Sequence, residues 1–221
     1  MPYEWDFSVV WRYTDLLVAG GVGTILLFLA ALAIAIPLGL ILAVTRLSRI
    51  PILSHLTVFY IDVFRASPAL VLIMWFYFVL PILLRVEFTA FTAATLALGL
   101  QSAAYMAEVY RSGIQAIGRG QSEAARSIGM SRASALWYII LPQAVKHALP
   151  VFFTRLIELL KSTALAAPIT YAELVYNATE IAARTFRPVE SFTVVALIYF
   201  VVIFAMSQLT RRVERRLALS D

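Results

Sequence analysis

Few residues in this chain have the side chains and spacing for chemistry, and their pattern favours ion pairing over catalysis. Asp62 and Arg65 are three residues apart, so they share a helix face and can pair. The same interval recurs in a second set, Arg155, Glu158 and Lys161. Because a charge in hydrocarbon costs about 2.5–3.5 kcal/mol on insertion scales, such groups usually face a bundle interior or a wet cavity. Two interpretations stay open: structural ion pairs that fix the helices, or groups that line a pathway for a charged or zwitterionic solute.

Catalytic and metal chemistry find no support in the sequence. There are no cysteines, which excludes disulfides, thiolate metal sites and thiol nucleophiles. The two histidines, His55 and His147, are far apart along the chain, so a histidine metal cluster is not expected. The G-x-x-x-x-G-K-[ST] phosphate loop, the G-x-S-x-G elbow and the H-E-x-x-H pair are all missing. We therefore expect a non-catalytic chain that hydrolyses no ATP and carries no metal or cofactor of its own.

The composition indicates a membrane protein. Hydrophobic residues make up 62% of the 221 residues and charged residues only 14%, and the mean hydropathy is +0.86. Soluble domains average about 45–50% apolar and about 25% charged residues. The net charge of +5 comes from basic residues between apolar stretches, which the positive-inside rule explains better than nucleic-acid binding does.

Five apolar stretches approach the length of about 20 residues that a membrane-spanning helix needs. They are Ala19–Val44, Leu53–Leu80, Phe91–Tyr110, a fourth from about Val145, and Phe192–Leu209. Lys and Arg are concentrated in the segments that would share a side with the C-terminus. This predicts a cytoplasmic C-terminus and, with five spans, an N-terminus outside. The expected fold is therefore an all-α polytopic membrane protein.

The segment after the fourth span is predicted to be irregular. Ser162–Thr170 contains Pro168 and several small residues, which favours a broken helix or turn. Irregular backbone at membrane depth is tolerated only where protein or an aqueous cavity covers it, so the break is expected near a translocation path. Tyr171–Ala183 then indicates a short amphipathic helix on the outer side.

The stretch from Arg111 to Ala144 is not membrane-like and predicts two short helices. Gln121–Ile128 consists of strong helix formers, and Gly129 is a natural residue to end that helix. Ser131 can cap a second helix, for which Pro142 marks the end. Just before this stretch, Glu108 is placed to brace the loop through Arg111.

Several motifs resemble those of ABC-importer permeases. The run Glu123-Ala124-Ala125, followed by Gly129 and by Ile139 and Leu141-Pro142, matches the family's EAA motif at every fixed spacing. Phe64-Arg65-Ala66-Ser67-Pro68 resembles its FRGTP-type sequence, and the stretch from Ala104 to Arg111 resembles its A-Y-x-A-E-x-x-R run. With Leu141-Pro142-Gln143-Ala144 and Lys161-Ser162-Thr163-Ala164-Leu165, the chain is similar to the polar amino acid uptake branch, whose permeases carry histidine, glutamine, glutamate or arginine.

The resemblance implies a MetI-like type I importer fold, one transmembrane permease domain over residues 1–221, and a coupling loop at 111–144. The residues implied in coupling to an ATPase are Gln121, Glu123, Ala124, Ala125, Ser127, Gly129, Ile139, Leu141 and Pro142. The hypothesis for the solute pathway comprises Asp62, Arg65, Glu108, Glu158, Lys161 and Thr163.

The resemblance also implies the surroundings of the chain. Expected partners are ATPase subunits that bind ATP and Mg, a second permease subunit, identical or related, a periplasmic or lipid-anchored solute-binding protein, and membrane lipid. The expected location is the bacterial inner membrane. The alternative is an ion- or proton-coupled secondary transporter, or a channel subunit, without an ATPase.

Overall fold

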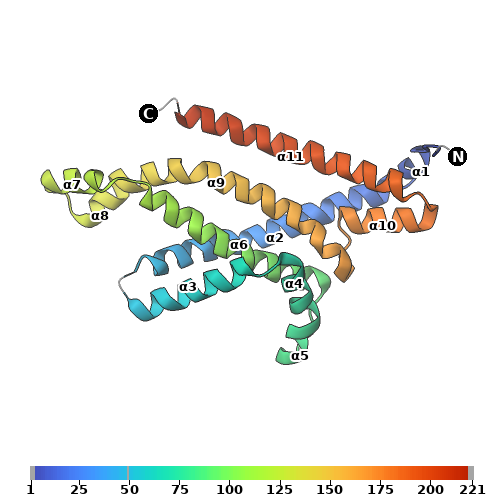
Figure 1. The fold of residues 1–221 in the computed structure, drawn as a ribbon, viewed down its shortest axis with the longest axis horizontal. Helices are drawn as coiled ribbons and strands as arrows, with labels where there is room; N and C mark the ends of the chain where they lie inside the picture. The colour runs from blue at the N-terminus through green and yellow to red at the C-terminus, as the bar shows by residue number, and fades with distance from the viewer. Residues whose placement is uncertain (1–2, 49, 219–221) are drawn as a thin grey trace.

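A computed structural model of the chain describes residues 3–48 and 50–218, apart from the side chains of 119 and 216–218, and all regular elements in these ranges are helices. Figure 1 shows an elongated bundle in which α7 and α8 lie at one end and α1 and α10 at the other. The longer elements are α2 (Thr14–Arg46), α3 (Pro51–Ala66), α6 (Ala90–Gln115), α9 (Leu141–Ser162), α10 (Leu174–Thr185) and α11 (Pro188–Ala218). The shorter α-helices are α1 (Ser8–Trp11), α4 (Ala69–Met74), α5 (Leu80–Leu84), α7 (Arg119–Ser127) and α8 (Arg132–Ala135). The π-helical turns η1 (Trp75–Val79) and η2 (Leu136–Ile140) and the 3₁₀ helix η3 (Thr163–Ile169) complete the set.

Helix α6 lies at the centre of the bundle, and small residues let its neighbours approach closely. A Cβ added to Gly39 of α2 would lie 2.6 Å from the Cβ of Met106 on α6. A Cβ at Gly99 of α6 would lie 3.0 Å from the Cβ of Ile34 on α2, so the two helices meet backbone to backbone. The largest core cluster lies around this contact and includes buried residues of α2, α6 and α9, among them Leu27 and Leu160.

Within the described ranges, three helices are long and apolar enough to cross a membrane: Thr14–Arg46, the continuous run Arg132–Ile169, and Pro188–Arg215. A fourth is obtained if the bent pair Pro51–Ala66 and Ala69–Leu84 counts as one span. Helix α6, the third span predicted from the sequence, is outside this set. It is rich in alanine, carries Gln101 and Glu108, and buries much of its surface against other helices. The count of five spans and the orientation of the termini therefore stay predictions.

The second predicted span, Leu53–Leu80, which the sequence marks as interrupted at Pro68, is a bent pair of helices, Pro51–Ala66 and Ala69–Leu84. The chain bends by 103° between Ala66 and Ala69. Ser67 is extended, as a residue before proline prefers to be, and Pro68 has no N–H to continue the ladder. The second arm ends at Leu84, shortly after Pro81.

The prediction that Pro142 closes the second loop helix is wrong. Ser131 caps α8 as predicted, with its hydroxyl accepting the N–H of Ser134 at 3.1 Å, but the helix then continues through η2 into α9. In η2 the N–H of Leu141 donates to the carbonyl of Leu136, five residues earlier. This wider turn accommodates the proline ring and its missing donor, so the helix passes Pro142 without ending.

The segment after Ser162 confirms the predicted irregularity. The helix tightens into η3 and ends at Thr170, whose φ of 62° is left-handed. The short helix predicted at Tyr171–Ala183 is confirmed as α10, with its bounds shifted to Leu174–Thr185. Glu173 caps it by accepting the N–H groups of Val175 and Tyr176 at 2.9 and 2.8 Å. Glu173 is fully buried, and this burial raises the pKa of its carboxyl despite those hydrogen bonds.

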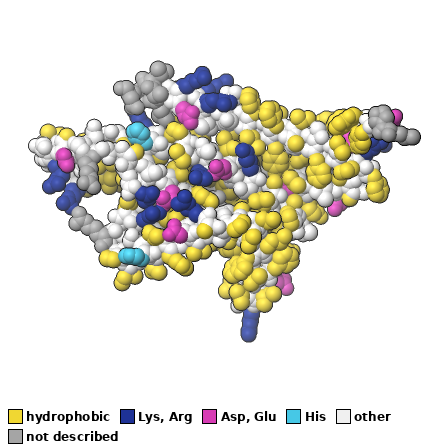
Figure 2. Space-filling model, in the orientation of Figure 1, with side chains coloured by type: hydrophobic (Ala, Val, Ile, Leu, Met, Phe, Trp, Pro, Cys, Tyr) yellow, Lys and Arg dark blue, Asp and Glu magenta, His cyan; other side chains and the backbone are white. Residues whose placement is uncertain are grey.

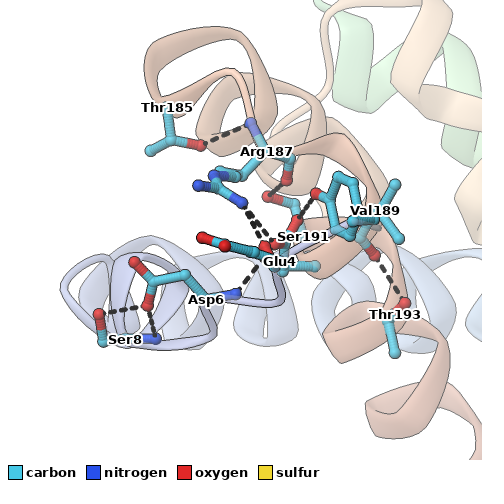
Figure 3. Close-up of polar contacts among 10 residues, drawn as sticks. Glu4, Asp6, Ser8, Thr185, Arg187, Val189, Ser191 and Thr193 are labelled. Carbon is cyan, nitrogen blue, oxygen red and sulfur yellow. Dashed lines mark hydrogen bonds and ion pairs between the residues drawn. The ribbon is translucent and has the colours of Figure 1, made fainter. Parts of the chain in front are cut away.

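At the opposite end from α7, a polar cluster fastens the N-terminal segment to the α10–α11 junction (Figure 3). The buried carboxylate of Glu190 accepts the hydroxyl of Tyr3 at 2.5 Å and the backbone N–H of Asp6 at 3.1 Å. Arg187 reaches across to the carbonyl of Glu4 at 2.7 Å and lies 3.3 Å from Glu190. These contacts hold residues 3–6 against the start of α11.

Candidate functional site

A polar cavity of 570 Å³ lies where α3, α4, α6 and α9 meet, directly at the 103° bend. On this face of the molecule, Figure 2 shows acidic and basic side chains gathered near α3 and α6, between wide apolar surfaces. The polar and charged residues that line the cavity are Arg65, Ser67, Gln101, Ser102, Tyr105, Arg155, Glu158, Lys161 and Ser162. The bend therefore opens a charged pocket between wide apolar surfaces.

Three of the six residues predicted for the solute pathway line this cavity: Arg65, Glu158 and Lys161. The other three, Asp62, Glu108 and Thr163, do not line it. Thr163 is fully buried and donates its hydroxyl to the carbonyl of Leu160 at 2.7 Å, so it supports the turn into η3.

The predicted ladder on α9 is confirmed for one pair. Arg155 lies 2.5 Å from the carboxylate of Glu158. The guanidinium of Arg155 also lies over the ring of Tyr105, 4.7 Å from its centroid. Lys161 has no ion-pair partner among the described residues, so the cavity lining carries more positive than negative charge.

Glu108 lies behind the cavity and holds three arginines together. Its carboxylate is 2.7 Å from Arg111, as the sequence predicted, and 3.9 Å from Arg65, and it also contacts Arg46. The expected pair between Asp62 and Arg65 does not form within the described part of the chain. Arg65 points instead toward α6, where Glu108 and the ring of Tyr105 receive it.

Two residues of the cavity, Gln101 and Tyr105, were not predicted from the sequence. The side-chain amide of Gln101 donates to the carbonyls of Phe64 and Ser67 at 3.2 and 2.7 Å. The hydroxyl of Tyr105 donates to the carbonyl of Arg65 at 3.3 Å. The A-Y-x-A-E-x-x-R run contains Tyr105, but only its place opposite the bend reveals this contact.

The loop predicted to couple the chain to an ATPase has a well-defined turn. Gly129 has a φ of 83°, its N–H donates to Arg126 at 3.0 Å, and the N–H of Met130 donates to Ala125 at 3.1 Å. This pair of hydrogen bonds is a Schellman motif, and it confirms that Gly129 ends the first helix.

The predicted coupling residues divide by position within the loop. On α7, Gln121, Glu123, Ala124 and Ser127 are exposed, whereas Ala125 is buried. Ile139, Leu141 and Pro142 lie further on, in the turn from η2 into α9. Large apolar side chains are exposed beside them: Ile128, Trp137 and Tyr138 are 77%, 65% and 78% exposed.

A helical bundle with membrane-length apolar helices, a polar cavity and a folded loop are features of a membrane transport component. No group of three or more His, Asp or Glu residues in the described ranges is arranged to hold a metal ion. Residues 35–219 match the family model of the binding-protein-dependent transport system inner membrane component, and the chain belongs to this family.

Similar proteins agree with this family. The glutamine transport system permease protein GlnP of Escherichia coli (strain K12) is 34% identical over 217 residues, 97% of this chain and 98% of that protein. The arginine transport system permease protein ArtQ of Bacillus subtilis (strain 168) is 32% identical over 216 residues, 98% of this chain and 99% of that protein.

Solved structures share the fold. The crystal structure of an amino acid ABC transporter with histidines superposes with a TM-score of 0.92 and 37% identity, over 97% of this chain and 100% of that one. The inward-facing MetNI methionine ABC transporter has a TM-score of 0.72 at 20% identity, over 91% of this chain and 96% of that one, and so shares the fold alone. The predicted MetI-like fold is therefore confirmed.

Proposed function

We propose that the chain is the permease subunit of an ABC importer and forms the pathway for a polar amino acid or an amino-acid derivative. The observation that carries this proposal is the charged cavity at the bend, because an amino acid needs both signs of charge. Arg65 and Arg155 can receive its carboxylate, and Glu158 can receive its ammonium group. The names of the relatives, which include glutamine and arginine permeases, support this solute class.

The loop from 111 to 144 couples the permease to a separate ATPase in this proposal. Its support is the compact turn at Gly129 beside exposed Ile128, Trp137 and Tyr138, since large apolar side chains with little cover are typical of a protein contact. The partner subunits bind ATP and Mg, and this chain hydrolyses none itself. A solute-binding protein, which the family description names, delivers the solute, and a second permease subunit completes the pathway.

The whole of residues 1–221 then acts as one permease domain in the bacterial inner membrane. Asp62, Glu108 and Thr163 support the pathway from outside the cavity lining, whereas Arg65, Glu158 and Lys161 face the solute.

Uptake by the assembled complex tests the proposal. The permease, its ATPase and its binding protein are reconstituted in vesicles, and uptake of labelled glutamine and arginine is measured with ATP and with an ion gradient alone. We expect uptake of at least one amino acid that requires ATP. Uptake driven by the ion gradient without ATP would favour the secondary transporter instead.

Two variants test the cavity. Glu158→Gln keeps an acceptor oxygen but removes the negative charge that faces the ammonium group, so the apparent affinity should fall by about tenfold. Lys161→Met should change the preference between neutral and basic amino acids. Glu180→Gln is the matched control, because it breaks an ion pair with Arg184 (3.3 Å) on α10, away from the cavity. Unchanged uptake in both cavity variants would remove these residues from the pathway.

A further inference from the structure

The end of α3 lacks the backbone donors that a continuous helix would have. In an unbroken helix, the N–H of residue 68 would donate to the carbonyl of Phe64 and the N–H of residue 69 to that of Arg65. Pro68 has no N–H, and the bend carries Ala69 out of line. The carbonyls at the end of α3 therefore need donors from elsewhere in the protein.

Helix α6 supplies those donors from one face. Gln101 donates to the carbonyls of Phe64 and Ser67, and Tyr105 donates to that of Arg65. Gln101 is only 7% exposed, so its amide is committed to the bend. Because Gln101, Tyr105 and Glu108 are spaced by four and three residues, they form one stripe along α6 that faces the end of α3.

The same stripe also receives the side chain of Arg65. Its guanidinium lies 5.6 Å from the centroid of the Tyr105 ring and 3.9 Å from the carboxylate of Glu108. Arg155 of α9 lies over the same ring at 4.7 Å. The Tyr105 ring thus contacts both guanidinium groups that line the cavity.

We propose that Gln101, Tyr105 and Glu108 position the guanidinium of Arg65 in the cavity wall, and thereby fix the place where an anionic group of the solute is bound. Gln101 bonds to backbone carbonyls on either side of Arg65, Tyr105 bonds to the carbonyl of Arg65 itself, and Glu108 acts on its charge. All three are positioning residues. The identity of the solute rests on the proposed function, whereas the positive potential at the bend does not.

Chemical labelling of the cavity tests this assignment without transport. The chain has no native cysteine, so Ser162→Cys, a nearly isosteric change in the cavity lining on α9, gives a single reporter thiol. In the complex with its partner subunits, the thiol is labelled with an anionic and a cationic methanethiosulfonate of similar size, and the ratio of the two rates is measured. Adding Arg65→Gln removes one positive charge at about 6 Å from the thiol, which in water changes each labelling rate by about threefold in opposite directions. The ratio of the anionic to the cationic rate should therefore fall by about tenfold.

The decisive variant is Gln101→Met, which keeps the side-chain length and the net charge but donates no hydrogen bond. We expect Gln101→Met to lower the logarithm of the labelling ratio by at least half as much as Arg65→Gln lowers it. Tyr60→Phe is the matched control, because it removes another hydrogen bond between α3 and α6, from Tyr60 to the carbonyl of Leu100 at 2.9 Å, away from the cavity. It should leave the ratio at the value of the parent.

Two results would overturn the assignment. The first is that Arg65→Gln lowers the labelling ratio whereas Gln101→Met leaves it unchanged. The second is that Arg65→Gln itself does not lower the labelling ratio. Uptake measured on the same variants separates this inference from the proposed function. Gln101→Met should raise the KM for uptake more than it lowers the maximal rate. Failure of uptake in the parent complex, with the labelling pattern intact, would contradict the proposed function alone.

Discussion

Replacing Gly129 by a residue with a Cβ strains the loop at its turn. Gly129 has a φ of 83°, in the left-handed region that other L-residues enter at a cost of about 1–2 kcal/mol. A Cβ built at this position meets nothing within 4 Å, so steric crowding adds no further cost. The whole effect of Gly129→Ala therefore comes from the backbone, which makes its size predictable.

A graded series follows from this backbone cost. Gly129→Asn should cost least, since asparagine tolerates the left-handed region, followed by Gly129→Ala and then Gly129→Val. For Gly129→Ala, about 1–2 kcal/mol corresponds to a 5–30-fold lower ratio of formed to open turn. Gly129→Pro should abolish the turn, because proline fixes φ near −65° and removes the N–H that donates to Arg126.

Hydrogen exchange of the backbone N–H of Met130 reads out the turn without any partner, because this N–H donates to Ala125 only while the turn is formed. Exchange should accelerate in the order Asn, Ala, Val, Pro. Transport per ATP hydrolysed by the assembled complex should fall in the same order if the loop couples the subunits.

Gly120→Ala is the matched control within the same loop. Gly120 lies inside α7, has no atom within 4 Å of an added Cβ, and is helical, so alanine should be neutral or stabilising there. If Gly129→Ala and Gly120→Ala had the same hydrogen exchange at Met130 and the same transport per ATP hydrolysed, backbone strain at Gly129 would not control the loop. Normal transport by Gly129→Pro would refute the coupling role itself.

Three further predictions concern stability in detergent, measured by thermal unfolding. Gly39→Ala should lower stability by about 1–3 kcal/mol, since the added Cβ would lie 2.6 Å from the Cβ of Met106, whereas Gly21→Ala, with nothing within 4 Å, should not. Glu190→Gln should lower the unfolding temperature because the Glu190 carboxylate accepts several donors in the N-terminal cluster, and an unchanged unfolding temperature would contradict this. Burial raises the pKa of Glu173 in the folded chain, so between pH 4.5 and this raised pKa the native state binds more protons than the unfolded state. The contribution of this group to the free energy of unfolding is complete below pH 4.5 and is lost as the pH rises through the folded pKa. Glu173→Gln should remove this fall, and parallel pH profiles for the two proteins would refute the assignment.

The features predicted correctly from the sequence are those that neighbouring residues determine. Gly129 ends α7 and Ser131 caps α8 through hydrogen bonds to residues three to five positions away. The pairs Glu108–Arg111 and Arg155–Glu158 likewise lie within one helical turn. Such contacts follow from helix geometry alone, so the sequence is enough to predict them.

The features that could not be predicted depend on residues far apart in the chain. Gln101 bonds to carbonyls 37 and 34 residues away, and the partner of Arg65 is Glu108 on another helix. Asp62 is closer to Arg65 in sequence and on the same helix, yet the packing of α3 against α6 directs the guanidinium to Glu108. A cavity lined by four helices cannot be derived from spacing within any one of them.

A comparison of Pro68 with Pro81 and Pro142 shows why the cavity lies where it does. Before Pro81 and Pro142, a π-helical turn donates to a carbonyl five residues back, so the helix passes the proline with its axis continued. Before Pro68 there is no such turn, and side chains of α6 bond to the freed carbonyls instead. Because these donors belong to α6, they satisfy the carbonyls at the end of α3 without continuing that helix. The chain therefore turns by 103° after α3. The bend carries α4 away from the line of α3, and the space beside it is the cavity into which Arg65, the cation of the last turn of α3, projects.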